Sequence, residues 1–282
     1  MKIFSPRTLL AAALLTALPM GTALACTTSA WSSVTGSAEA GNPKGRDGEP
    51  AVPRYSGTCA LQAASAGTSY VTDNTPGSEA VYRARFYVFT GSAANNPKIF
   101  SATTEDDGGG TEVVGVSING SALTFAVNGT TVTDTVPVAA SKWYGVEIAY
   151  QANGPFEAKV RGNAAAAETV VASAGNAGAL TVGSASLGVL NAASNTVPLA
   201  FDAFESTRSA DTEVGRLCPG DANNDGIVNA LDALAAINEF PSSGTYSLGQ
   251  PDCTEDGIVN ALDALCAMNR FTVPAQRTCS AN

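Results

Sequence analysis

The sequence predicts a mainly β protein, in which an antiparallel jelly-roll β-sandwich is followed by a small α-helical domain with two loop–helix motifs. From about residue 57 to residue 207, β-branched and aromatic residues alternate with polar ones and show no helical period. Near residue 208 a polar connector begins, and the apolar residues beyond it take a helical spacing. We therefore predict four parts: a signal peptide at 1–25, the sandwich at 26–207, a linker at 208–217 and the helical domain at 218–282.

The N-terminal segment has the composition of a secretory signal peptide. A basic start at Lys2 and Arg7 precedes a short apolar run, and small residues at positions 23 and 25 favour cleavage after Ala25. The run is too short to span a bilayer and no later stretch is long enough, so no membrane span is predicted. We expect a secreted protein, extracellular or periplasmic. Lipidation of Cys26 is the less favoured alternative, because Leu24 lies one place from the usual lipobox position.

The charge and the absence of one residue type exclude several function classes. The formal net charge is -10, and loss of Lys2 and Arg7 with the signal peptide makes it more negative. An acidic surface disfavours nucleic acid and anionic membranes as partners and favours cations. The chain contains no histidine, which excludes Ser-His-Asp triads, histidine general bases and histidine-ligated metals.

The strands of the sandwich can be placed individually. The clearest stretch, from residue 112 to residue 138, predicts three strands joined by hairpins at Asn119–Gly120 and Asn128–Gly129. Asn-Gly favours the positive φ that a type I′ turn needs at both central positions. The other predicted strands cover residues 80–90, 98–102, 142–150, 156–162 and 198–207. Many short strands of this kind indicate a sandwich rather than a small barrel.

The six cysteines fall into two groups separated by a long stretch without cysteine. An even number of cysteines in an exported chain indicates disulfide bonds. In the N-terminal part, Cys26 has only Cys59 as a possible partner. The C-terminal group allows three connectivities. It consists of Cys218, Cys253, Cys266 and Cys279.

The predicted strands RARFYVF, KWYGVEIAY and FDAFESTR, with the paired Asn-Gly hairpins, make the sandwich resemble the laminin-G-like or concanavalin A-like superfamily over about half of the chain. The resemblance implies a lectin-like module that serves either recognition, with an extracellular glycan as the candidate partner, or structure. Glucanases of this superfamily carry Glu-x-Asp-x-x-Glu on one strand, whereas here Asp202 and Glu205 match only the second half and Ala200 replaces the first glutamate. A non-catalytic sandwich is therefore favoured, and a polysaccharide-degrading enzyme or accessory subunit is the alternative. We interpret the strand aromatics as core residues, including Trp143 and Tyr87.

The chemistry of the C-terminal domain lies in a repeat. At an offset of 31 residues, the sequence DGIVNALDAL occurs at 225–234 and again at 256–265. Each copy is a twelve-residue acidic loop that leads into an amphipathic helix. Oxygens at loop positions 1, 3, 5, 7, 9 and 12, with glycine at position 6, follow the logic of EF-hand calcium loops.

The predicted ligands are oxygen atoms at equivalent positions of the two loops, with a backbone carbonyl at position 7 and an asparagine that binds directly or through water at position 9. The first loop contributes Asp221, Asn223, Asp225, Ile227, Asn229 and Asp232. The second contributes Asp252, Thr254, Asp256, Ile258, Asn260 and Asp263. The number of oxygens suits calcium better than magnesium, which demands tight octahedral geometry. Two calcium ions are predicted.

Both loops end in aspartate, contain Gly-Ile-Val-Asn and are joined by a short linker, so residues 217–282 resemble a type I dockerin. The resemblance implies two calcium ions, two helices in pseudo-twofold relation and docking to a cohesin-like protein. The family's recognition positions fall on 230–231 and 261–262, where Ala-Leu stands instead of the usual hydroxyl residue. A basic residue usual later in the helix is present as Arg270, whereas the first copy has Glu239. We predict that two apolar stripes form the core between the helices: Leu231, Leu234, Ile237, Leu262, Leu265 and Met268.

Overall fold

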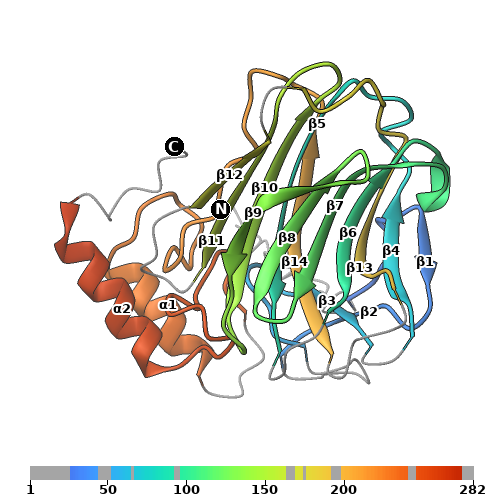
Figure 1. Cartoon of the computed structure of the whole chain (residues 1–282). Coiled ribbons are helices and arrows are strands. Elements are labelled where there is room, and N and C mark those ends of the chain that lie inside the picture. Colours follow the sequence, from blue (N-terminus) through green and yellow to red (C-terminus); the bar gives the residue numbers. More distant parts are fainter. Residues whose placement is uncertain are drawn as a thin grey trace, which may run out of the picture.

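The computed structural model describes residues 26–43, 52–64, 67–91, 96–162, 169–173, 176–191, 198–240 and 246–274. The predicted signal peptide and Cys279 lie outside these ranges. Two antiparallel sheets of seven strands face each other (Figure 1). In spatial order the first contains β1 (Ser33–Thr35), β4 (Ser69–Asp73), β13 (Ser184–Val189), β6 (Lys98–Thr103), β7 (Glu112–Asn119), β8 (Ala122–Val127) and β9 (Thr130–Pro137). The second contains β12 (Thr169–Ser173), β11 (Phe156–Gly162), β10 (Trp143–Gln151), β5 (Val81–Phe89), β14 (Leu199–Thr207), β3 (Ala60–Ala63) and β2 (Glu39–Gly41).

The predicted mainly β sandwich is confirmed. Every strand predicted from the sequence is present within one or two residues of its expected bounds. The short strands β1 to β4, β12 and β13 were not predicted. Three to six residues rich in alanine, serine and glycine give a weak alternation signal, and β13 is buried on both faces, so it does not alternate at all.

The main core lies between the sheets. Alternate residues of the central strand β5 point inward, and Phe86 stacks on Phe100 of the opposite sheet with ring centroids 5.3 Å apart. Trp143 and Tyr87 are also buried, as predicted for the strand aromatics. They belong to a second apolar cluster, on the outer face of the sheet that contains β5.

One hairpin differs from the prediction. The second turn is Asn128–Gly129, and both residues have positive φ, as expected for a type I′ turn. The first turn is formed by Gly120–Ser121 instead of Asn119–Gly120, and only Gly120 has positive φ. This turn sets a register in which the inward residues of β7 face three apolar residues of β8. The pairs are Ile118 with Leu123, Val116 with Phe125, and Val114 with Val127. Matching these buried side chains decides the register.

The helical domain consists of α1 (Ala230–Glu239) and α2 (Ala261–Thr272), which lie together at one side of the sandwich (Figure 1). Each helix begins with a capping box, in which an asparagine and an aspartate satisfy backbone N–H groups of the first turn. None of the described helices has the length and apolar character needed to cross a bilayer.

The predicted core between the helices is wrong. All six stripe residues are exposed, from 38% for Met268 to 62% for Leu231. The helices instead pack through small side chains: Val228, Ala233, Ala236, Ala264 and Ala267. The reason is the placement of Asp232 and Asp263, which are fully buried and turn toward the loops. Because successive helical residues are rotated by about 100°, fixing these aspartates inward turns the adjoining alanines into the core and the leucines outward.

The predicted linker is bound to the sandwich along its length. Arg83 and Arg85 of β5 donate hydrogen bonds to the carbonyls of Ala210 and Gly215, at 2.6 and 2.7 Å. The carboxylate of Glu147 accepts hydrogen bonds from two further linker N–H groups. The linker therefore covers the outer face of this sheet and places the helical domain beside the sheet.

Candidate metal centre

The first loop gathers three carboxylates. Oxygens of Asp221, Asp225 and Asp232 all lie within 4.8 Å of one another, and among the described residues this is the acidic group that meets that criterion. The loop is closed by its own backbone, because Asp221 accepts hydrogen bonds from the N–H groups of Asp225 and Gly226 at 3.0 and 2.9 Å. Gly226 has φ +83°, a conformation that glycine adopts without steric cost. These groups fit a hard cation with oxygen ligands.

The remaining predicted ligands of the first loop have a second role. Asn223 accepts from the N–H of Asp225 at 2.9 Å. The Asn229 side chain caps α1 by accepting from the N–H of Leu231 at 2.7 Å, and its amide donates to the carbonyl of Ile227 at 3.2 Å. This placement of Asn229 suits contact with a cation through water better than direct ligation.

The second loop repeats this arrangement. Asp252 accepts from the N–H groups of Asp256 and Gly257 at 3.1 and 2.7 Å. The hydroxyl of Thr254 donates to Asp263 at 2.9 Å. Asn260 caps α2, and its amide donates to the carbonyl of Ile258 at 3.3 Å. In the first loop Asp221, Asp225 and Asp232 thus converge, and in the second the side chain of Thr254 lies against Asp252 and Asp263. The full set of twelve ligands stays a prediction.

Burial makes both groups of carboxylates electrostatically strained without a cation. Burial raises the pKa of Asp221 and of Asp232 above the usual value. Burial, followed by the nearby charge of Asp263, raises the pKa of Asp252 well above the usual value. Desolvation and like charges disfavour the ionised form, and a divalent cation removes both penalties.

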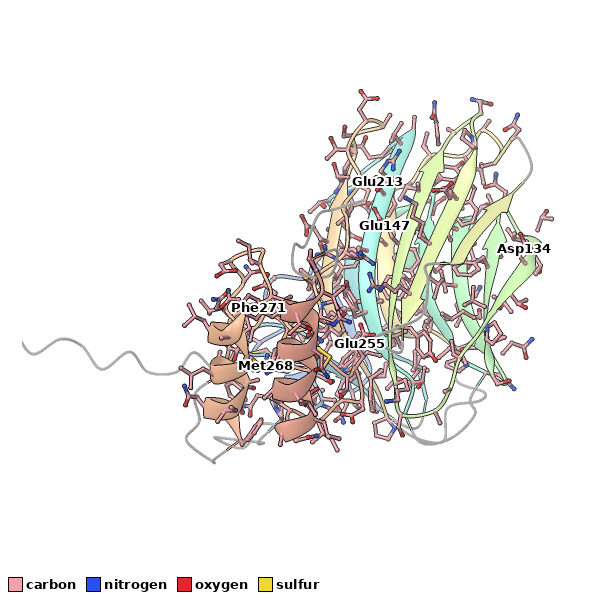
Figure 2. All side chains as sticks on the ribbon, turned by 90° about the vertical axis from the view of Figure 1, so that its left-hand side faces the viewer. Asp134, Glu147, Glu213, Glu255, Met268 and Phe271 are labelled. Atoms are coloured by element: carbon pink, nitrogen blue, oxygen red, sulfur yellow. A yellow bond between two sulfur atoms is a disulfide. The ribbon has the colours of Figure 1, made fainter. Side chains whose placement is uncertain are left out.

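The surroundings of the two loops differ. At position 4 of the first loop, Asn224 is exposed. The equivalent Glu255 is 2% exposed and lies where the helical domain meets the sandwich (Figure 2). Its carboxylate accepts from the hydroxyl of Tyr55 at 2.7 Å, and its carbonyl accepts from the N–H of Trp143 at 3.1 Å. Glu255 holds φ +55°, which is uncommon for glutamate, so these contacts stabilise a conformation that is otherwise unfavourable.

The dockerin family, which this domain resembles, usually has a basic residue late in the helix, and the equivalent positions 239 and 270 also interact with the sandwich. Glu239 in α1 is buried and forms an ion pair with Arg54. Arg270 occupies the equivalent place in α2, and burial lowers the pKa of its guanidinium while the charge of Glu255 opposes the shift. Both copies therefore use this position inside the molecule.

Two disulfides join described cysteines. Cys26 is bonded to Cys59 at the start of the sandwich. Cys253 of the second loop is bonded to Cys266 of α2. Cys218 is also disulfide-bonded. The second loop is thus held covalently to its own helix as well as by the sandwich.

The two acidic residues considered for catalysis lie on β14. Asp202 accepts hydrogen bonds from the N–H groups of Tyr55 and Ser56 at 2.6 and 2.9 Å, and burial raises its pKa to about 6. Glu205 pairs with Arg85 at 2.8 Å. A β-bulge separates the two residues. Both carboxylates therefore hold local structure, with Asp202 fixing the segment that carries Tyr55.

Sequence reasoning missed the residues that join the domains, namely Arg54, Tyr55, Glu239 and Glu255. A weak signal existed in the repeat itself, where Asn224 and Glu255 differ within otherwise similar loops. Such a difference shows that the loops have different surroundings but does not identify their partners.

Several solved structures align with about half of the chain at low identity. A botulinum neurotoxin type G receptor binding domain aligns with a TM-score of 0.38 and 14% identity, over 54% of this chain and 39% of that one. A xylan β-1,4-xylosidase from Bacillus halodurans C-125 aligns with a TM-score of 0.39 and 10% identity, over 52% and 32%. The chain thus spans about two fifths of the first and a third of the second. A protein of unknown function from Shewanella oneidensis MR-1 aligns with a TM-score of 0.35 and 12% identity, over 55% of this chain and 72% of that one.

No curated protein matches the chain. A family model does match its C-terminal part, and members of that family bind calcium. The match begins just before the first loop and ends at the last residue of α2, so it contains both copies of the repeat. Residues 219–272 of this chain match the dockerin type I domain family.

Proposed function

We propose that this is a secreted, non-catalytic protein in which two calcium ions organise a dockerin-like domain that docks to a cohesin-like partner, while the sandwich serves recognition or structure. The observation that carries the proposal is the exposed apolar face of α1 and α2. Single exposed apolar residues are ordinary on a protein surface, but a contiguous apolar patch indicates an interaction site.

The face has the composition of a protein interface. Leu231, Leu234 and Ile237 of α1 correspond to Leu262, Leu265 and Met268 of α2, and all six are exposed. Side chains of charged residues at the ends of the helices do not belong to it, since Glu239 and Arg270 turn toward the sandwich. An apolar centre with few charges is typical of the core of a protein–protein interface.

Calcium supports the face indirectly. Asp232 and Asp263 are ligands at position 12 in the proposed sites and also define which side of each helix is buried. A domain of this size usually needs a metal or disulfides to fold, and here a disulfide accompanies a group of carboxylates suited to a metal. The ions therefore stabilise the domain and orient its docking face.

Isothermal titration with calcium tests the metal sites. Wild-type protein should bind two ions, and Asp225→Ala and Asp256→Ala should each bind one. Absence of binding heat and of any calcium-dependent rise in thermal stability would refute the metal assignment.

Docking is tested with an isolated type I cohesin domain, in calcium and in EDTA. We expect binding only in calcium, and loss of binding in Leu231→Asp/Leu262→Asp. Leu248→Asp is the matched control, because Leu248 is 76% exposed but lies outside the two helices. Binding that survives the double substitution would contradict the proposed face.

The non-catalytic character of the sandwich is tested by glycan hydrolysis. We expect no turnover of soluble polysaccharides. Turnover abolished by Glu205→Gln, with the fold intact, would overturn this part of the proposal and favour a polysaccharide-degrading enzyme.

A further inference from the structure

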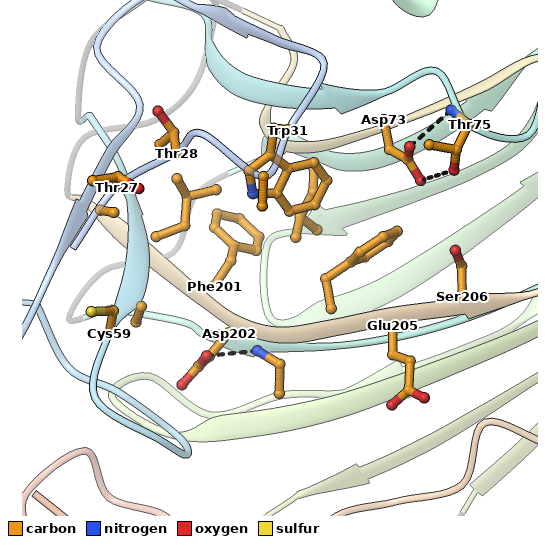
Figure 3. Close-up of a pocket in the computed structure, with 17 residues that line it drawn as sticks. Thr27, Thr28, Trp31, Cys59, Asp73, Thr75, Phe201, Asp202, Glu205 and Ser206 are labelled. Atoms are coloured by element: carbon orange, nitrogen blue, oxygen red, sulfur yellow. Dashed lines mark hydrogen bonds between the residues drawn. The ribbon is translucent and has the colours of Figure 1, made fainter. Parts of the chain in front are cut away.

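A cavity of about 510 Å³ opens between the two sheets, and no residue of the two acidic loops lines it (Figure 3). Leu187 of β13 lines it from one sheet, and Leu61 of β3 and Phe201 of β14 line it from the other. The N-terminal segment that follows Cys26 closes one side and supplies Trp31. The volume falls in the range of roughly 300–1,000 Å³ that is typical of small-molecule sites.

Aromatic side chains form the walls of this cavity. The rings of Trp31 and Phe204 are 4.9 Å apart and inclined at 45°, and both are only partly buried. In Figure 3, Trp31 and Phe201 lie on one side of β14, whereas Asp202 and Glu205 point to the other. The space is therefore bounded mainly by apolar and aromatic surface.

Three polar residues of the lining, Asp73, Thr75 and Ser206, are already hydrogen-bonded. Asp73 accepts from the N–H and the hydroxyl of Thr75, at 2.9 and 3.0 Å. Arg208 donates to Thr75 and to Ser206, at 2.7 and 2.8 Å. A ligand that buries many hydroxyl groups would leave most of them without partners, which is costly. A ring with one polar group at the rim avoids this cost.

We propose that this cavity binds a small neutral aromatic molecule with a single polar substituent, such as a phenolic ring. The flat ring packs against the Trp31–Phe204 pair, whose own rings are already in contact, and over the apolar floor, while the substituent remains at the rim beside Asp73 and Ser206. The rim carboxylate and the acidic chain disfavour an anion. The inference does not depend on calcium binding.

Fluorine NMR of para-fluorophenol tests the proposal, since its resonance broadens and shifts on binding. Trp31→Ala should weaken binding about tenfold, as expected for the loss of a central tryptophan contact. Ala40→Leu should also weaken it, because Ala40 lines the cavity and a larger side chain fills the space. Tyr70→Ala is the control, since Tyr70 lies on β4 close to the lining residue Asp73 and does not itself line the cavity.

Each outcome decides the question. Binding lost in Trp31→Ala and in Ala40→Leu, but kept in Tyr70→Ala, supports the site. If Trp31→Ala fails to fold, Trp31→Phe and Ala40→Leu provide the same comparison. Binding unchanged in Ala40→Leu would overturn the proposal. Displacement of the probe by methyl glucoside at lower concentration than by phenol would overturn the ligand class and indicate a sugar site.

Discussion

The two acidic loops continue into their helices through an identical ten-residue sequence and yet differ in what surrounds them. The tip of the first loop, at Asn224 and Gly226, faces solvent. The tip of the second is pressed against the sandwich, where Glu255 meets Tyr55 and Gly257 meets Phe89. Duplicated motifs therefore need not have equal functions. The second loop acts as a joint between domains, whereas the tip of the first loop is exposed.

The largest expected effect comes from the equivalent helix positions 239 and 270. Glu239→Ala removes one partner of a buried ion pair and leaves the Arg54 charge uncompensated, which costs about 3–5 kcal/mol. Arg270→Ala should cost less, because Arg270 is only partly buried whereas both side chains of the Arg54–Glu239 pair are almost fully buried. Urea unfolding in excess calcium measures both. Equal losses would show that the two helices are anchored alike.

The glycines at loop position 6 form a matched pair. Both have positive φ, so alanine is strained at either position by about 1 kcal/mol. A Cβ at Gly226 meets nothing within 4 Å, whereas at Gly257 it would lie 2.6 Å from the Phe89 ring. Overpacking adds about 1–3 kcal/mol. Gly257→Ala should therefore be clearly less stable than Gly226→Ala in urea unfolding, and a reversed order would contradict the packed interface.

Tyr55→Phe is a milder perturbation of the contact between the second loop and the sandwich. It leaves the buried Glu255 carboxylate without its hydroxyl donor, which costs about 1–3 kcal/mol. Calcium affinity should fall at the second site and stay unchanged at the first. The measurement is titration of Tyr55→Phe combined with Asp225→Ala or with Asp256→Ala, so that each site is observed alone. An equal fall at both sites would mean that the loops are not separately coupled to the sandwich.

The smallest effect concerns pH. Without calcium, an aspartate whose pKa is raised in the folded state binds its proton more tightly there than in the unfolded chain. This contribution to stability is complete when the pH is below the ordinary pKa of 3.8, and it is lost as the pH rises through the raised pKa of the folded state. Calcium requires the ionised form, so in excess calcium the trend reverses and acid destabilises the fold. Because the pKa of Asp252 is raised well above its usual value, the second site should release calcium at higher pH than the first. Calcium titrations of Asp225→Ala, which keeps the second site, and of Asp256→Ala, which keeps the first, compare the two sites between about pH 7 and pH 5.

Much of this architecture follows from local sequence signals. Alternation places the long strands, and ligand spacing places both loops, because these features depend on residues close together in the chain. The errors concern longer-range effects. The first hairpin turn moved by one residue so that Ile118 meets Leu123, and the leucine stripes turned outward because Asp232 and Asp263 fix the helices. The contacts of Arg54 and Tyr55 with the helical domain join residues about 200 positions apart, which no local pattern reports.

The burial of Asp232 and Asp263 has a consequence for how a partner senses calcium. Each aspartate precedes an alanine of the helix core and follows a leucine of the exposed face. Without a cation each carboxylate is repelled by the other carboxylates of its own loop. We propose that the helices then roll so that these aspartates reach water and the leucines turn inward. On this proposal a bound ion controls which side of the helix a partner meets, without touching the leucines of that surface. Recognition would be lost with the metal even while the helices themselves remain.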